Sequence, residues 1–328
     1  MTNLAAYRRF WHPLALMEEI LDKPHSFELL GEKLVAFRTK HGISVFKDVC
    51  IHRGCALSVG RLTDDRIECA YHGWQYDHTG KCVRIPALDA AQSIPSKAKA
   101  VVYRTQDLAG LLWVALEEPQ APMPAFPEDC EFSHPELRSF HLNTYDWSID
   151  AGRAMENFLD VAHFGFVHDG SLGDQSQTLV APYDVKSDDF AIRYDYPQLQ
   201  PGDPTTGGDV EIVLRFLYQT PFTVHIKREA SQSKWSCVSL FIAPVSETRC
   251  RVFVTIIRNF DLDPALDKVY ASFVDSALKE DENILSNVHP EQIPIDLREE
   301  LHIRIPDAAG LEFRRMLGRI EKAALPKG

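Results

Sequence analysis

Two short stretches decide how this chain is interpreted: CIHRG at residues 50–54 and CAYHGWQY at residues 69–76. In the first, one residue separates Cys50 from His52; in the second, two residues separate Cys69 from His72. The 16 residues 53–68 lie between the two pairs. Each stretch places a thiol and an imidazole on one tight loop, so the two loops together are predicted to hold a metal centre.

The order of the four ligands discriminates between two kinds of metal centre. Zinc is the main alternative, because two Cys and two His form common structural zinc sites, usually as a Cys pair followed by a His pair. Here each loop mixes one Cys with one His. That order favours a [2Fe–2S] cluster in which one iron takes two thiolates and the other takes two imidazoles. Gly54 and Gly73 follow the histidines closely and give both loops room to turn.

The two stretches resemble the Rieske domain of the Rieske non-haem iron oxygenases. Respiratory Rieske proteins carry an additional cysteine in or just after each stretch, and these two cysteines form a disulfide. In this chain Cys55 stands at the first of those places, but Tyr71 stands at the second. That disulfide therefore cannot form, which favours the oxygenases. Cys82 is the remaining candidate for a replacement partner.

A second motif, MENFLDVAHFGFVH, occupies residues 155–168. Asp160 and His163 are three residues apart, which predicts that they share one face of a helix over 147–166. His168 requires that helix to end or distort, and Gly165 allows this. Two imidazoles and a carboxylate suit a facial triad that holds Fe(II) with open positions for O₂. Two unrelated histidines near a helix end are the alternative.

The second motif also resembles the iron-binding motif of the same oxygenases, in which an acidic residue and Asn precede the Asp and the two His. Glu156 and Asn157 fill those opening positions. The resemblance implies that His163 and His168 are ligands of a mononuclear iron. It places the third ligand on a long C-terminal helix, at Asp281.

Further roles follow from the resemblance alone. Glu280 is the runner-up for the third iron ligand. Asp160 is implied to be catalytic, as a bridge between His163 and the cluster ligand His72 of a neighbouring subunit in a head-to-tail homotrimer. Electrons are implied to come from NAD(P)H through a separate reductase or ferredoxin, since no Gly-x-Gly-x-x-Gly fingerprint follows a strand in this chain.

The rest of the chain predicts an α+β protein with two parts. Residues 27–49 and 66–116 are predicted to form short strands, and residues 1–117 are predicted to form an all-β Rieske domain. Residues 118–128 are rich in proline and form the expected linker. Residues 129–328 are predicted to form the catalytic domain, helix-grip-like by resemblance, with strands at 210–218, 222–229, 235–245 and 250–260 and a long helix over 263–288. Asp263 and Pro264 are typical of the start of that helix.

Composition narrows the classes of partner. The 35 Lys and Arg against 47 Asp and Glu give a net charge of −12, which argues against nucleic acid or an anionic membrane as the main partner. No stretch is long and apolar enough for a membrane helix, and charged residues interrupt the N-terminal apolar residues where a signal peptide would be continuous. We therefore expect a cytoplasmic protein.

Pocket residues are predicted less directly. The candidates Asn157, Phe158, Phe164 and Phe166 flank the iron motif, although such aromatics are more often core. Five further side chains on predicted strands are also candidates: Trp235, Phe241 and Ile256 could face the iron, and His225 and Lys227 could orient a polar substrate.

Length and local likeness suggest the reaction. The chain resembles the homotrimeric oxygenase components, such as toluenesulfonate methyl-monooxygenase, vanillate- and dicamba-type demethylases and saxitoxin-pathway hydroxylases. This implies hydroxylation or oxidative demethylation of a small organic substrate. A phthalate-type ring dioxygenase, a pure electron-transfer Rieske protein and a catalytically silent partner subunit are the alternatives.

Overall fold

The computed structural model describes residues 3–89, 91–202, 208–230 and 234–325, so the outermost ends of the two expected domains lie outside the described residues. The chain divides into two compact units. Residues 8–120 form one unit, and residues 121–328 together with the N-terminal residues through Tyr7 form the other. The division falls inside the proline-rich segment. Each unit is described by itself.

The unit of residues 8–120 is built from two antiparallel sheets. The larger has the strand order β1-β10-β9-β4-β3-β2 and the smaller has the order β5-β6-β7-β8. Their bounds are β1 His12–Leu16, β2 His25–Leu29, β3 Glu32–Thr39, β4 Gly42–Lys47, β5 Arg61–Thr63, β6 Arg66–Glu68, β7 Gln75–Tyr76, β8 Cys82–Arg84, β9 Val102–Leu108 and β10 Leu111–Ala115. The short 3₁₀ helix η2 Met17–Glu19 lies within this unit, whereas most of η1 Leu4–Arg9 precedes it in the sequence. No α-helix occurs in the described part of this unit, which is therefore all-β as expected.

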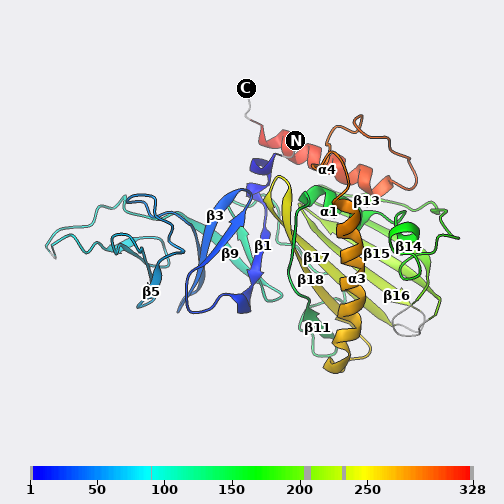
Figure 1. The fold of residues 1–328 in the computed structure, drawn as a ribbon, viewed down its shortest axis with the longest axis horizontal. Helices are drawn as coiled ribbons and strands as arrows, with labels where there is room; N and C mark the ends of the chain where they lie inside the picture. The colour runs from blue at the N-terminus through cyan, green and yellow to red at the C-terminus, as the bar shows by residue number, and fades with distance from the viewer. Residues whose placement is uncertain (1–2, 90, 203–207, 231–233, 326–328) are drawn as a thin grey trace. The chain divides into compact units, whose positions relative to one another are not determined.

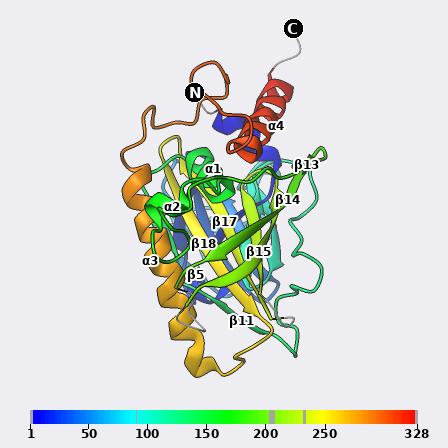
Figure 2. The same cartoon turned by 90° about the vertical axis from the view of Figure 1, so that its right-hand side faces the viewer.

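The other unit is a twisted antiparallel sheet with helices packed on it (Figures 1 and 2). The strand order is β11-β18-β17-β16-β15-β14-β13, and β12 also pairs with β18. The strands are β11 Arg138–His141, β12 Tyr145–Trp147, β13 Lys186–Ser187, β14 Ala191–Gln200, β15 Val210–Gln219, β16 Thr223–Ala230, β17 Trp235–Ser246 and β18 Arg249–Arg258. The helices are α1 Ala151–Leu159, α2 Phe164–Val167, η3 Pro264–Leu266, α3 Asp267–Leu285 and α4 Ala308–Ala324.

Helix α3 runs along one face of the sheet in both views. Asp263 caps η3, because its side chain accepts a hydrogen bond from the N–H of Ala265, and Pro264 follows at the first helical position. This confirms the predicted start of the long helix. The α+β class is confirmed as well. Helix α4 was not predicted. Among the described residues, no helix is long and apolar enough to cross a membrane.

The single helix predicted over 147–166 is wrong. Residue 147 ends β12, α1 ends at Leu159, and α2 begins only at Phe164. The interruption has a local cause: the Asp160 carboxylate accepts hydrogen bonds from the backbone N–H groups of Ala162 and His163, at 3.1 and 2.9 Å. A side chain that satisfies these donors competes with the helical hydrogen bonds and ends the helix.

Candidate metal centres and substrate pocket

Two loops of the all-β unit that carry Cys50 and Cys69 have the same backbone hydrogen bonds. The N–H of Cys50 donates to the carbonyl of Cys55, and the N–H of Cys69 donates to the carbonyl of Trp74. Gly54 and Gly73 donate back to the cysteine carbonyls. Both glycines have positive φ, at 72° and 67°, where a side chain would strain the backbone.

The four side chains expected to hold a cluster converge at the tips of these loops. Cys50 and Cys69 are each 2 % exposed, and the rings of His52 and His72 lie 4.5 Å apart. The Tyr76 hydroxyl lies 3.1 Å from Cys50 Sγ. His52 Nδ1 is buried and has no hydrogen-bond partner among the described residues. A buried ring nitrogen without a partner, beside two thiols and a second imidazole, fits the mixed donor set of a [2Fe–2S] cluster.

A second convergence of donors joins three segments of the catalytic unit. His163 lies in the interruption between α1 and α2, His168 follows α2, and Asp281 projects from α3. Their ligand atoms all lie within 4.8 Å of one another. Asp281 Oδ1 is 3.5 Å from His163 Nε2 and 3.1 Å from His168 Nε2, yet within the described part of the chain it accepts no well-oriented hydrogen bond. This arrangement fits two imidazoles and a carboxylate around one cation.

Electrostatics at these three residues favour a bound cation. Burial raises the pKa of the Asp281 carboxyl, but its interactions with the two nearby imidazoles outweigh burial and lower the pKa to about 2. Burial lowers the pKa of His163, whereas its hydrogen bond to Asp160 and its charge interaction with Asp281 raise it to about 9. A cation at Nε2 would replace the proton that these carboxylates otherwise stabilise.

In each imidazole, Nδ1, the ring nitrogen that does not face Asp281, is hydrogen-bonded to a carboxylate. His163 Nδ1 lies 2.8 Å from Asp160 Oδ2, and His168 Nδ1 lies 2.7 Å from Glu280 Oε2. These bonds place a proton on each Nδ1 and direct each Nε2 toward Asp281. Glu280, the runner-up for the third ligand, therefore occupies the outer position at His168. Asp160 reaches His163 across a turn and not along the helix face that its spacing predicted.

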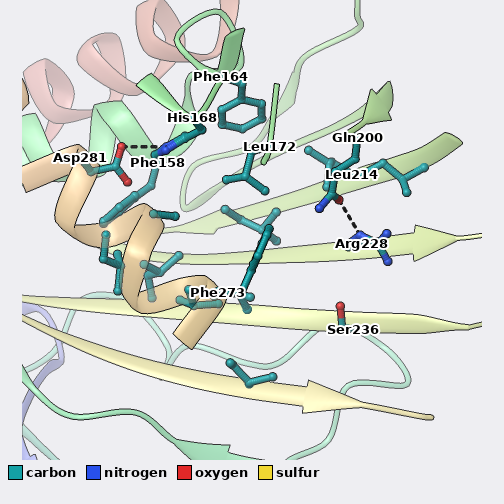
Figure 3. A pocket seen from close by; sticks show the side chains of 18 of the residues that line it. Phe158, Phe164, His168, Leu172, Gln200, Leu214, Arg228, Ser236, Phe273 and Asp281 are labelled. Atoms are coloured by element: carbon teal, nitrogen blue, oxygen red, sulfur yellow. Dashed lines mark hydrogen bonds and ion pairs between the residues drawn. The ribbon is translucent and has the colours of Figure 1, made fainter. Parts of the chain in front are cut away.

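A largely apolar pocket lies between α3 and the sheet, and His163, His168 and Asp281 line one end of it (Figure 3). On α3 it is lined by Tyr270, Phe273, Val274, Ala277, Leu278 and Asp281, and on the strands by alternate residues of β14 to β17 and by Ile256 of β18. Figure 3 shows His168 and Asp281 at one end and Gln200 and Arg228 toward the other. The pocket can therefore hold an apolar molecule with one end beside the three ligand residues.

Three of the four expected pocket residues, Asn157, Phe158 and Phe164, line this cavity. Phe166 does not, because its side chain is 64 % exposed. The reason is the short helix α2, which turns successive side chains to different sides, so that Phe164 faces the cavity and Phe166 faces solvent.

Among the strand residues predicted to line the pocket, Ile256 does so, whereas the others are each one residue away from a residue that does. Ile226 and Arg228 line the pocket, whereas His225 and Lys227 point to the opposite face of β16. His225 is buried there, and its Nδ1 lies 2.7 Å from the Ser239 hydroxyl. In β17, Ser236, Val238 and Leu240 line the pocket, so Trp235 and Phe241 do not. A strand alternates its faces residue by residue, and a shift of one residue exchanges the two sets.

The sequence reasoning missed the polar residues Gln198, Gln200 and Arg228 of the pocket wall. Gln200 is 1 % exposed. The signal was present in β14, where Tyr194, Tyr196, Gln198 and Gln200 alternate on one face of the strand. Polar residues that continue a buried face commonly mark a binding site.

Comparisons with known proteins agree with this geometry. Residues 10–95 match the Rieske [2Fe-2S] domain, and residues 147–323 match the vanillate O-demethylase oxygenase C-terminal domain. The chain is 29% identical over 332 residues to methylxanthine N1-demethylase NdmA of Pseudomonas putida, covering 96% of this chain and 90% of that protein. It is 29% identical over 323 residues to methylxanthine N3-demethylase NdmB of the same species, covering 94% and 88%. The structure of NdmA with caffeine superimposes with a TM-score of 0.85 at 26% identity, over 98% of this chain and 93% of that one.

Proposed function

We propose that this chain, which belongs to the Rieske oxygenases with a vanillate O-demethylase-type C-terminal domain, oxidatively removes a methyl group from a nitrogen or oxygen atom of a small organic substrate. The chain is an oxygenase component, which works with a reductase or ferredoxin and uses O₂. The observation that carries the proposal is the triad of His163, His168 and Asp281 at one end of an apolar pocket. Similarity to two N-demethylases over nearly the whole chain supports the reaction type.

Each metal group is assigned to its own unit. We assign the [2Fe–2S] cluster to Cys50, His52, Cys69 and His72, with support from the convergence of the two loops and from the buried His52 Nδ1, which has no partner among the described residues.

The mononuclear Fe(II) is assigned to His163, His168 and Asp281, with support from their mutual distances and burial. When bound, the cluster supplies single electrons from the reductase and the iron supplies O₂ activation.

The protein side chains perform the positioning. Asp160 and Glu280 keep a proton on Nδ1 of His163 and His168, which leaves each Nε2 lone pair for the metal. Phe158 and Leu278, which are 6 % and 3 % exposed, line the pocket and exclude water from the reacting end. The overall reaction consumes O₂, two electrons and two protons, and yields the demethylated substrate, formaldehyde and water.

We further infer that the working unit is a homotrimer in the cytoplasm, in which Asp160 of one copy meets His72 of the next. His72 is exposed on its own unit, and Asp160 lines a surface hollow with Ala162, Val288 and His302, so both residues are available to a neighbouring copy. Sedimentation velocity tests the trimer. Mixed trimers of His72→Ala and Asp281→Ala copies should regain part of the activity that each variant lacks, and no recovery contradicts transfer between subunits.

The reaction is tested with a chemically reduced or reductase-coupled holoenzyme and a panel of aromatic N-methyl and O-methyl compounds. Formaldehyde should form in a 1:1 ratio with the demethylated product. A ring diol, or a hydroxylated product without formaldehyde, would overturn demethylation. Asp281→Ala should abolish turnover and keep the visible spectrum of the cluster, which separates iron loss from a folding defect.

A further inference from the structure

Two buried thiols lie behind the pocket wall, outside both metal centres. Cys130, in the segment that follows the proline-rich linker, and Cys237 of β17 are each 0 % exposed. Together with Ile257 of β18 they form one buried cluster. Partly buried side chains pack against this cluster: Phe126, Phe132, Leu137 and Trp235. Both cysteines are free thiols, so two reduced sulfur atoms share one apolar cluster.

Strand alternation fixes the side of the sheet on which Cys237 lies. Its neighbours Ser236 and Val238 line the pocket, so Cys237 projects from the opposite face of β17. On that face Lys227 of β16 is directly opposite Cys237 in the strand register, and Ile257 of β18 is opposite it on the other side. Side chains at such positions are close neighbours. The Cys237 thiol therefore faces the buried cluster and has a cationic side chain beside it.

The segment that carries Cys130 covers this face of the sheet. The Phe126 ring lies 5.0 Å from the His225 ring and 6.0 Å from the Phe241 ring, and both of these side chains project from the same face as Cys237. The N–H of Cys130 donates to the carbonyl of Pro127 at 3.0 Å, which closes a tight turn. The turn directs the Cys130 side chain inward, onto the cluster.

Cys130 lies close beneath the surface although its thiol is buried. Its two neighbours in sequence, Asp129 and Glu131, are exposed, and the segment from 121 to 137 contains no helix or strand. Local opening of such a segment costs less free energy than global unfolding. A small oxidant can therefore reach the Cys130 thiol without unfolding of the sheet.

The two thiols differ in acidity. Interaction with the Cys237 thiol lowers the pKa of Cys130, and the positive charge of Lys227 lowers it further, although burial opposes both. Interaction with Cys130 and burial raise the pKa of Cys237 well above its usual value. Burial likewise raises the pKa of Cys250, a third buried thiol. Because the thiolate is the reactive form of cysteine, Cys130 is the member of the pair that meets an oxidant first.

We propose that Cys130 and Cys237 are a site of reversible oxidation, at which a peroxide closes a disulfide between them. The Cys130 sulfur attacks one peroxide oxygen and the O–O bond breaks. Cys130 becomes a sulfenic acid, and its thiol proton leaves with the displaced hydroxide as water. The Cys237 sulfur then attacks the Cys130 sulfur, the S–O bond breaks, and the hydroxide and the Cys237 proton leave as a second water.

The balance of this reaction explains why the pair matters. Two thiols and one hydrogen peroxide give one disulfide and two waters, and two electrons pass from sulfur to oxygen. A thiol without a partner continues to the sulfinic acid, which thiol reductants do not reverse, whereas a neighbouring thiol stops the oxidation at the disulfide. Cys237 therefore protects Cys130, and the crosslink joins the segment after the linker to a strand of the pocket wall.

The test treats the holoenzyme with hydrogen peroxide and alkylates the remaining thiols after denaturation. Peptide mapping by mass spectrometry should find Cys130 joined to Cys237, and the pair should be oxidised at least about 10-fold faster than Cys250. Dithiothreitol should restore both thiols. The visible spectrum of the cluster, followed during the treatment, confines the comparison to intact protein. A sulfinic acid at Cys130 in place of the disulfide, or oxidation of the pair no faster than that of Cys250, overturns the proposal.

Variants distinguish a disulfide-forming pair from two independent thiols. In Cys237→Ala, peroxide should convert Cys130 to a sulfinic acid that dithiothreitol does not reverse, and in Cys130→Ala the Cys237 thiol should remain reduced. Cys250→Ala is the matched control, because it also removes a buried thiol from the catalytic unit and should still form the disulfide at the wild-type rate. Oxidation of Cys130 that stays fully reversible in Cys237→Ala overturns the proposal. The peptide map of the wild type decides the question even where a variant does not fold.

Discussion

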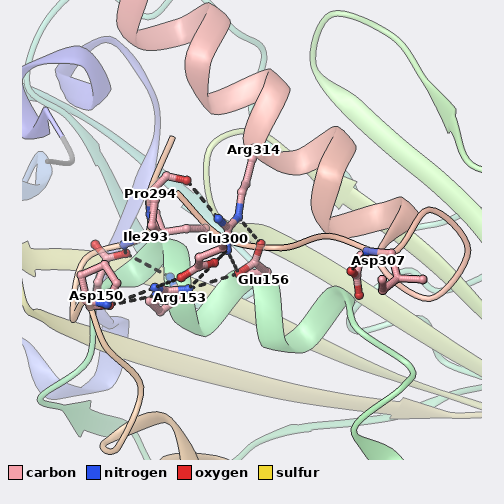
Figure 4. Close-up of polar contacts among 10 residues, drawn as sticks. Asp150, Arg153, Glu156, Ile293, Pro294, Glu300, Asp307 and Arg314 are labelled. Carbon is pink, nitrogen blue, oxygen red and sulfur yellow. Dashed lines mark hydrogen bonds and ion pairs between the residues drawn. The ribbon is translucent and has the colours of Figure 1, made fainter. Parts of the chain in front are cut away.

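Replacing Arg314 with methionine should lower the free energy of unfolding of the catalytic unit by about 3 kcal/mol. Arg314 of α4 is 2 % exposed and contacts two carboxylates (Figure 4). Its Nε and Nη2 donate to Glu156 at 2.5 and 2.7 Å, and Nη2 also donates to Glu300 at 2.5 Å. Arg153 completes the group, at 2.6 Å from Glu300 and 3.7 Å from Glu156.

The magnitude follows from what the substitution leaves behind. Without Arg314, Glu156 and Glu300 share the single guanidinium of Arg153. Removing one partner of a buried ion pair costs about 3–5 kcal/mol. Glu156 and Glu300 are 20% and 26% exposed, so water solvates their carboxylates in part after the substitution, and the cost lies at the lower end of that range, about 3 kcal/mol. For a unit of this size each kcal/mol corresponds to about 2–4 °C, which gives a decrease in Tm of about 6–12 °C.

Differential scanning calorimetry of the purified holoenzyme measures this change. Arg319→Met is the control on the same helix. Arg319 is 52% exposed, and its Nη2 contacts Glu312 at 3.4 Å, so losing its side chain should cost less than about 0.5 kcal/mol. Adding Glu156→Gln to Arg314→Met should restore part of the stability, since it removes the carboxylate left without a partner. A decrease in Tm no larger than that of the control would refute the reasoning.

Three further predictions concern pH, redox potential and turnover. Burial raises the pKa of Asp150 to about 6, so its contribution to stability is fully present below the unfolded pKa and is lost as pH rises through 6. The free energy of unfolding of Asp150→Asn in urea, relative to that of the wild type, should therefore increase by on the order of 3 kcal/mol between pH 4 and pH 7. A difference between the two proteins that stays constant with pH contradicts this. Tyr76→Phe removes the hydroxyl beside Cys50 Sγ and should lower the reduction potential of the cluster in a redox titration, whereas an unchanged potential argues against that hydrogen bond. Asp160→Asn should reduce turnover by at least about 10-fold with the cluster spectrum unchanged, because the amide holds His163 Nδ1 less strongly; full activity would exclude the role.

The sequence by itself determined the features that depend on short-range spacing. The two Cys/His stretches and the Asp-x-x-His-x-x-x-x-His motif are local, so the residues between ligands fix their separation whatever the rest of the chain does. The start of the long helix at Asp263 and Pro264 is local in the same way. Period-two alternation likewise predicted the strands, although not which side of each strand would face the pocket.

Tertiary structure alone decided which distant side chains meet. Asp281 and Glu280 are neighbours in sequence, and only the rotation of α3 against the two histidines gives one the inner position and the other the outer. Likewise, the pairing of Gln200 with Arg228 joins strands β14 and β16, which are not adjacent in the sheet. Such contacts depend on how α3 and the sheet pack together, a long-range property that no short stretch of sequence encodes, whereas the cluster motif needs little more than its own two loops.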